Sequence, residues 1–139
     1  MYEILLVEDR PLDVALTKRA IEKTELDCTL TVASHGREAL EKLAKLKEAH
    51  RHIDLVLLDW MMPIMNGEEF LARFREEAEY SNVPVIILTT SSDSRDVHLA
   101  HSLGCNAYMI KPVGVSKFQS AVNSFKEFWF DVAVLPKIA

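Results

Sequence analysis

The stretch Leu55-Val56-Leu57-Leu58-Asp59 decides the fold, because four consecutive apolar residues before a carboxylate are typical of a strand buried on both faces. Three other apolar runs, at residues 4–7, 85–88 and 107–110, also end in polar residues. The polar residues that follow them are Glu8-Asp9, Thr89-Thr90 and Lys111-Pro112. Strands buried on both faces belong to a parallel sheet that helices cover on each side.

Five predicted helices alternate with the strands. The first lies over about 11–24, the second follows Gly36 with apolar residues from 39 to 46, and the third follows a turn at 63–67 with apolar residues from 70 to 74. The fourth lies over about 93–103, and the fifth begins near Val115 and continues to Trp129. The last one has a single apolar stripe, formed by Val115, Phe118, Val122, Phe125 and Trp129. Residues 29–32 alternate polar and apolar, which predicts a strand at the edge of the sheet. The expected fold is therefore α/β, a five-stranded doubly wound parallel sheet in the order 2-1-3-4-5, the flavodoxin-like (βα)5 arrangement.

The composition predicts one cytoplasmic domain over residues 1–139. With 139 residues the chain can build one core but not two ordinary domains. A net charge of −5 argues against nucleic acid as a partner, and no apolar run approaches the ~20 residues that span a membrane. The N-terminus lacks a signal-peptide pattern, and the spacing of Cys28 and Cys105 is not that of metal ligands. Both cysteines are expected to be reduced thiols.

The predicted strand ends bring complementary chemistry to one crevice, where open α/β sheets bind ligands. Glu8, Asp9 and Asp59 would meet there, and three carboxylates repel one another unless a proton or a cation is present. Because the donors are all oxygens, we expect Mg²⁺ (or Mn²⁺). Asp59 can present an oxygen as nucleophile to a phosphoryl group, whose own oxygens would contact the Lys111 ammonium and the Thr89 hydroxyl.

With these residues the chain resembles the response-regulator receiver domains (CheY-like proteins) over nearly its whole length. The resemblance implies that Glu8 and Asp9 are the acidic metal-binding pair and that Asp59 is the phosphoacceptor. It also implies that Met61 contributes its backbone carbonyl to the magnesium.

The same resemblance implies a switch that responds to phosphorylation. Thr89, followed by Thr90, would move toward the phosphoryl group, and Tyr108 would swing inward with it. Lys111 would contact the phosphoryl group, and the resemblance implies a cis peptide bond before Pro112.

A narrower resemblance concerns Leu88-Thr89-Thr90-Ser91 and the C-terminal residues, which are similar to stand-alone regulators of bacterial phytochrome histidine kinases. It implies a sensor histidine kinase as partner and a homodimer. Residues 128–139 form an apolar extension, and apolar residues outside the helical stripe indicate an interface. The alternative is that this extension folds back on its own domain. The candidate surface consists of Phe128, Trp129, Phe130, Val132, Leu135 and Pro136.

These observations predict a two-component response regulator that takes a phosphoryl group from a histidine kinase onto Asp59 and signals through its fourth helix, fifth strand and fifth helix. We expect no enzyme activity beyond self-catalysed phosphotransfer and autodephosphorylation. One alternative is a scaffold that acts without phosphorylation. An aspartate-nucleophile phosphohydrolase would need a second acid where Met61 stands, and a flavodoxin-like electron carrier would need a phosphate-binding loop in place of Glu8-Asp9-Arg10-Pro11.

Overall fold

A single parallel sheet organises the molecule. The computed structural model describes residues 1–136, and its strands follow the order β2-β1-β3-β4-β5, which confirms the predicted topology. All four neighbouring pairs are parallel. The strands are β1 (Tyr2–Val7), β2 (Cys28–Ala33), β3 (Leu55–Leu58), β4 (Val85–Thr89) and β5 (Ala107–Ile110).

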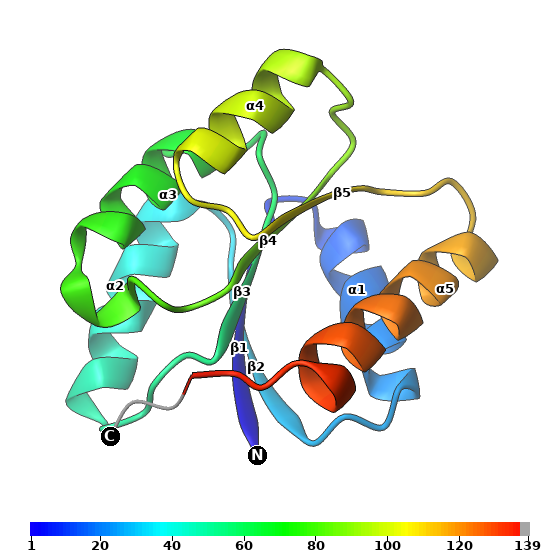
Figure 1. The fold of residues 1–139 in the computed structure, drawn as a ribbon, viewed down its shortest axis with the longest axis horizontal. Helices are drawn as coiled ribbons and strands as arrows, with labels where there is room; N and C mark the ends of the chain where they lie inside the picture. The colour runs from blue at the N-terminus through cyan, green and yellow to red at the C-terminus, as the bar shows by residue number, and fades with distance from the viewer. Residues whose placement is uncertain (137–139) are drawn as a thin grey trace.

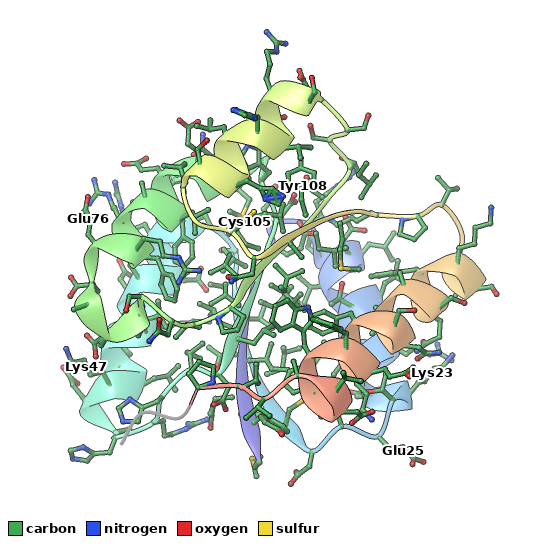
Figure 2. All side chains as sticks on the ribbon, viewed as in Figure 1. Lys23, Glu25, Lys47, Glu76, Cys105 and Tyr108 are labelled. Atoms are coloured by element: carbon green, nitrogen blue, oxygen red, sulfur yellow. The ribbon has the colours of Figure 1, made fainter. Side chains whose placement is uncertain are left out.

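Five helices cover the two faces of this sheet (Figure 1). Helices α1 and α5 lie on one face, and α2, α3 and α4 lie on the other. Charged side chains such as Lys23, Lys47 and Glu76 point away from these layers (Figure 2). The helices are α1 (Pro11–Lys23), α2 (Gly36–Glu48), α3 (Gly67–Glu76), α4 (Ser94–Ser102) and α5 (Val115–Lys126), with short turns at η1 (Ala78–Tyr80) and η2 (Glu127–Val132).

The burial of each strand matches its position at the centre or the edge of the sheet. The residues of β3 and β4 are all buried, as expected for apolar runs covered by helices on both sides. In β2 only Ala33 is fully buried, and the residues of β5 are half-buried or exposed. The predicted edge position of residues 29–32 is therefore confirmed, and β5 forms the opposite edge.

The loop after β3 is tightly packed against the end of that strand. A Cβ atom at Gly67 would lie 2.6 Å from the carbonyl oxygen of Asp59, so only glycine fits without displacing the backbone. The Met65 amide donates to the Pro63 carbonyl at 2.7 Å, and Ile64 between them has φ of 66°. A β-branched residue with this φ is strained, so the loop between β3 and α3 holds Ile64 in an unfavourable backbone conformation.

The C-terminal segment corrects part of the predicted surface. After α5 the chain forms a π-helical turn, η2, whose wider i→i+5 spacing places Phe130 in the core five residues after Phe125. Phe130 and Leu135 are only 8% and 7% exposed and belong to the core on the α1–α5 face, so their assignment to an interface is wrong. Trp129 is half-buried against the same core.

Other residues of the extension remain exposed. Phe128 and Val132 are 54% and 65% exposed, and Pro136 is also exposed. At the other end of the predicted stripe, Val115 is exposed rather than buried, because it opens the helix at the margin of the α1–α5 contact. Within residues 1–136, no helix is long and apolar enough to span a membrane.

Candidate functional site

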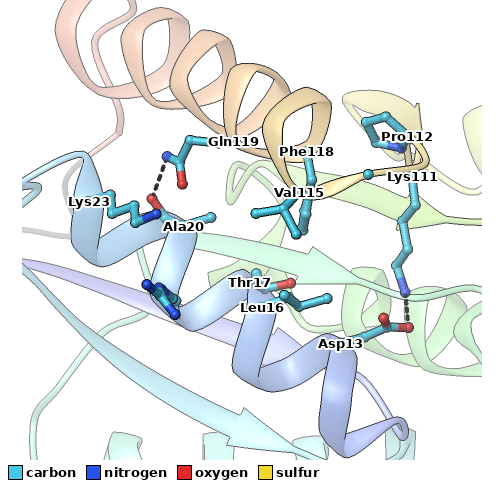
Figure 3. A pocket seen from close by; sticks show the side chains of 12 residues that line it. Asp13, Leu16, Thr17, Ala20, Lys23, Lys111, Pro112, Val115, Phe118 and Gln119 are labelled. Carbon is cyan, nitrogen blue, oxygen red and sulfur yellow. Dashed lines mark hydrogen bonds and ion pairs between the residues drawn. The ribbon is translucent and has the colours of Figure 1, made fainter.

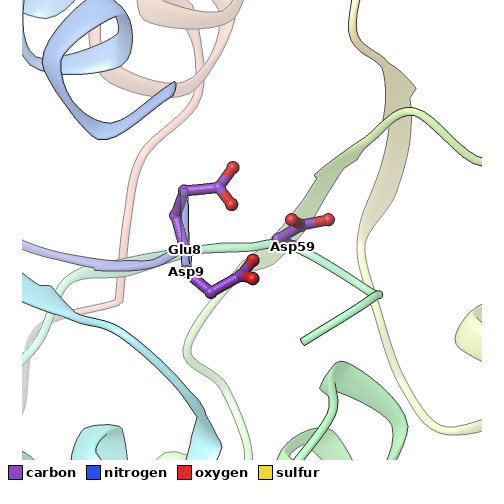
Figure 4. A group of neighbouring side chains, drawn as sticks. All are labelled: Glu8, Asp9 and Asp59. Atoms are coloured by element: carbon purple, nitrogen blue, oxygen red, sulfur yellow. The ribbon is translucent and has the colours of Figure 1, made fainter. Parts of the chain in front are cut away.

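Three carboxylates converge where β1 and β3 end (Figure 4). Glu8 and Asp9 follow β1, Asp59 follows β3, and one oxygen of each lies within 4.8 Å of the others. The backbone fixes this arrangement, because the Asp59 amide donates to the Val7 carbonyl at 2.9 Å. β1 and β3 are neighbours in the sheet although α1, β2 and α2 lie between them in the sequence. 

The topology of the sheet, rather than proximity in the sequence, therefore brings these carboxylates together.

The crowding of these acids changes their proton affinity. Burial, followed by a hydrogen bond with Asp59, raises the pKa of Glu8 to about 7. The contact with Lys111 opposes this rise without cancelling it. Glu8 is only 3% exposed, so without a bound cation its carboxyl group retains a proton close to neutral pH even beside Lys111.

Lys111 supplies positive charge to this cluster from the end of β5. Its ammonium group forms an ion pair with Glu8 and lies 3.1 Å from Oδ2 of Asp13 and 3.8 Å from Oδ2 of Asp59. Burial alone would lower the pKa of Lys111, but the hydrogen bond to Glu8 and the charge of Asp59 outweigh it and raise the pKa. The lysine is therefore held in its charged form beside Asp59.

Asp13 is a member of the site that the sequence analysis missed. It lies in the first turn of α1, and its carboxylate accepts from Lys111 (Figure 3). A cleft of about 180 Å³ between α1 and α5 opens beside this pair. The sequence places Asp13 in the first turn of the helix that follows the acidic pair, but no spacing in the sequence shows its contact with Lys111.

Two buried polar atoms at this edge of the sheet are unpaired. Among residues 1–136, Oδ1 of Asp9 and Oγ1 of Thr89 are buried and have no hydrogen-bond partner. Burying a polar atom without a partner is costly, so each atom is suited to a group that binds there. A carboxylate oxygen suits a hard cation, and a hydroxyl suits a phosphoryl oxygen. The donor set therefore fits Mg²⁺ or Mn²⁺.

Comparison with known proteins assigns the family. The model of the response regulator receiver domain matches residues 4–123. The chain belongs to this family. Receiver domains receive phosphoryl groups from sensor histidine kinases and bind Mg²⁺ or Mn²⁺ at an acidic pocket.

Two relatives resemble this receiver over most of their length. The probable methanogenesis regulatory protein FilR2 of Methanothrix harundinacea is 32% identical over 129 residues, which cover 92% of this chain and 83% of FilR2. Response regulator Rcp1 of Synechocystis is 30% identical over 135 residues, which cover 96% of this chain and 92% of Rcp1.

Solved structures of this kind match the receiver closely. The phosphorylated cyanobacterial phytochrome response regulator RcpA superposes with a TM-score of 0.90 and 30% identity, covering 98% of this chain and 99% of RcpA. The Mn²⁺-bound form of Rcp1 superposes with a TM-score of 0.85 and 28% identity, covering 99% of this chain and 100% of Rcp1.

The remaining predicted residues of the receiver site differ in exposure. Thr90 is exposed beside the buried Thr89, and the side chain of Met61 is 63% exposed. Tyr108 is half-buried, and its hydroxyl donates to the Ser91 carbonyl at 3.0 Å. No hydrogen bond found in residues 1–136 joins these three residues to the carboxylates.

The expectation for Pro112 is wrong in this structure. Residues 1–136 contain no cis peptide bond, so the bond between Lys111 and Pro112 is trans. Trans is the favoured isomer of a bond to proline by about 0.5–1 kcal/mol, and the Lys111 amide still donates to the Thr89 carbonyl at 2.7 Å.

Proposed function

We propose that this protein is a two-component response regulator that accepts a phosphoryl group from a histidine kinase on Asp59. The observation that carries this proposal is the placement of Asp59 beside Glu8 and Asp9, with the Lys111 ammonium 3.8 Å from its carboxylate. The chain acts as a single receiver over residues 1–139, with 128–139 as its extension, and catalyses no reaction on another substrate.

The proposed transfer uses one oxygen of Asp59 as the nucleophile. This oxygen attacks the phosphorus of the kinase phosphohistidine, a phosphorus–oxygen bond forms, and the phosphorus–nitrogen bond breaks as the histidine leaves. Lys111 would then bind one phosphoryl oxygen, exchanging part of its interaction with Glu8 for the new charge. The Thr89 hydroxyl would donate to another oxygen, which would satisfy its unpaired atom.

We propose Mg²⁺, or Mn²⁺, as the metal at the acidic cluster. Glu8, Asp9, Asp59 and the backbone carbonyl of Met61 would hold it, Asp9 through its unpaired oxygen. The bound ion would offset the repulsion between the Asp59 carboxylate and the incoming phosphoryl group. Glu8 would lose its proton when the ion binds, because the metal ion and the proton compete for the same carboxylate oxygens.

The output of the switch is proposed to pass through the α4-β5-α5 surface. Thr89 ends β4 and Thr90 begins the loop before α4, and the Tyr108 hydroxyl connects β5 to that loop. We further propose that the protein forms a homodimer. The residues that remain candidates for its interface are the exposed Phe128, Val132 and Pro136, with the half-buried Trp129 beside them.

The likeness to RcpA and Rcp1 supports a phytochrome-type histidine kinase as the partner, acting in the cytoplasm. FilR2, named a probable methanogenesis regulatory protein, is as similar to this chain in sequence as Rcp1 is. The identity of the kinase therefore requires a direct test. Transfer from a purified phytochrome kinase that is faster than transfer from an unrelated kinase supports this pathway, and equal rates argue against it.

The site assignment is tested by measuring intact mass after incubation with Mg²⁺ and acetyl phosphate. The wild-type protein should gain one phosphoryl group, and Asp59→Asn should gain none. Asp54→Asn is a matched control, because Asp54 lies at the opposite end of β3 and contacts the Glu3 amide instead. Equal phosphorylation of the wild type and Asp59→Asn would refute the assignment. No phosphorylation of the wild type despite metal binding would favour a scaffold.

A further inference from the structure

Helix α4 begins at a hydrogen-bonded junction centred on Ser91. The Tyr108 hydroxyl donates to the Ser91 carbonyl oxygen at 3.0 Å, and the Ser91 hydroxyl donates to Oδ2 of Asp96 at 2.6 Å. Tyr108 comes from β5, and Asp96 lies in the first turn of α4. One residue of the β4–α4 loop therefore connects the edge strand of the sheet to the helix.

Asp96 is not required to cap the helix. The N-cap residue is Asp93, whose side chain accepts from the Arg95 amide at 2.9 Å. Asp93 and Arg95 are exposed, whereas Asp96 and Ser91 are half-buried. The carboxylate of Asp96 is thus available to Ser91, and a hydrogen bond to an ionised carboxylate is roughly twice as strong as one between neutral groups.

The junction lies two residues after Thr89, whose buried hydroxyl has no partner among residues 1–136. The Thr89 carbonyl is tied to β5 by the Lys111 amide at 2.7 Å. The segment from Thr89 to Ser91 is therefore attached to β5 at both ends, through Lys111 and through Tyr108. The Ser91 hydroxyl extends this attachment to α4, because it donates to Asp96 in the first turn at 2.6 Å and accepts from the amide of the N-cap residue Asp93 at 3.4 Å.

We propose that Asp96 is a positioning residue that couples the Thr89 loop and Tyr108 to helix α4 through Ser91. The proposal rests on the proposed function, in which that loop responds to phosphorylation of Asp59. With the contact in place, a displacement of Ser91 moves the first turn of α4. Without it, Ser91 and Tyr108 rearrange while α4 keeps its position.

The coupling is measured first without phosphorylation, by amide chemical shifts in the full-length protein. Tyr108→Phe removes the hydroxyl that donates to Ser91 but keeps the ring that packs against the core beneath α4 (Figure 2). In the wild-type background this change should shift the amides of residues 91–97. In an Asp96→Ala background, the shifts of residues 94–97 should fall at least about threefold. Asp96→Asn should restore them, because its amide oxygen still accepts from Ser91.

Asp93→Ala is the matched control, because it removes the N-cap and leaves the Ser91–Asp96 contact. An equal loss of coupling in Asp93→Ala would show that helix-end stability explains the effect, and would overturn the proposal. Unchanged shifts of residues 94–97 in Asp96→Ala would also overturn it. Both results are independent of whether Asp59 accepts a phosphoryl group.

The second measurement adds acetyl phosphate and Mg²⁺ to the wild type and to Asp96→Ala. Intact mass should show one phosphoryl group on each, because Asp96 has no contact with Asp59 in the hydrogen bonds of residues 1–136. The phosphorylation-dependent shifts should persist in residues 89–91 and fall at least about threefold in α4 of the variant. Full retention of the α4 shifts would overturn the coupling, whereas a missing mass gain in the wild type would overturn the proposed function alone.

Discussion

The ammonium group of Lys111 forms an ion pair with Glu8, a residue 103 positions away in the sequence. Both side chains are largely buried, and Asp13 and Asp59 lie within 4 Å of the same ammonium group. One lysine therefore offsets the repulsion among several acids.

Replacing Lys111 should destabilise the protein in a pH-dependent way. Lys111→Met leaves the Glu8 carboxylate buried without its ion-pair partner, which should cost about 3 kcal/mol of unfolding free energy at pH 8. The loss should be smaller at pH 5, where Glu8 holds a proton in either protein. Urea unfolding at the two pH values measures this, with the exposed Lys117→Met as control. An equal loss at both pH values would contradict the prediction.

The metal-free protein should lose stability as the pH rises toward neutrality. The pKa of Glu8 is raised from its ordinary 4.5 to about 7 in the folded state, so the folded protein binds this proton more tightly than the unfolded chain. Its contribution is fully present below about pH 4.5 and disappears as the pH passes about 7, amounting to at most about 3 kcal/mol.

Mg²⁺ should reverse this trend, because the ion replaces the proton among the carboxylates. The melting temperature should therefore rise more on adding Mg²⁺ at pH 8 than at pH 5, and chelation should abolish the gain. Glu8→Gln removes the titrating group and should flatten the profile of the metal-free protein between pH 4.5 and 7. A wild-type profile that is already flat there would refute the raised pKa.

Gly67 should tolerate no side chain. The Cβ atom of Gly67→Ala would lie 2.6 Å from the Asp59 carbonyl oxygen and 2.8 Å from Cα of Trp60, so backbone must move. We expect a loss of about 1–3 kcal/mol and slower phosphorylation, because the displaced segment carries the nucleophile. The neighbouring exposed Glu68→Ala should stay within about 0.5 kcal/mol of wild type. Chemical denaturation measures the free energy of unfolding of both variants. Equal stabilities would be evidence against the close packing of Gly67 on Asp59 and Trp60.

Replacing Phe128 and replacing Phe130 by alanine should affect different properties of the protein. Phe130 packs edge-to-face on Tyr2 with ring centroids 4.7 Å apart, so Phe130→Ala should cost about 3 kcal/mol or more. Phe128 is 54% exposed, so Phe128→Ala should change stability little but weaken the proposed dimer. Urea unfolding and sedimentation velocity measure the two effects separately. Unchanged self-association of Phe128→Ala would remove this residue from the interface.

Much of the fold follows from local patterns that each strand and helix carries by itself. Apolar runs such as Leu55–Leu58 are read directly as buried strands, and the alternation of residues 29–32 identifies an edge. The convergence of Glu8, Asp9 and Asp59 follows from topology alone, because strand ends at a switch point share one crevice.

The residues that sequence reasoning misplaced depend on geometry that a regular period does not contain. The stripe in α5 predicts Trp129 as its next core residue, but the π-helical turn advances the core position to Phe130. Asp13 joins the site only because Lys111 reaches it across the sheet edge, and no spacing within α1 reveals that contact. The isomer before Pro112 depends on loop conformation, which composition leaves open.

The central claim is that Asp59 itself carries the phosphoryl group. Borohydride reduces an aspartyl phosphate to homoserine, so peptide mass mapping after reduction of the phosphorylated protein locates the modified residue. The account predicts homoserine at position 59 and at no other aspartate. Homoserine at Asp9 or Asp13 instead, or a protein that gains phosphoryl mass without homoserine at position 59, would contradict it.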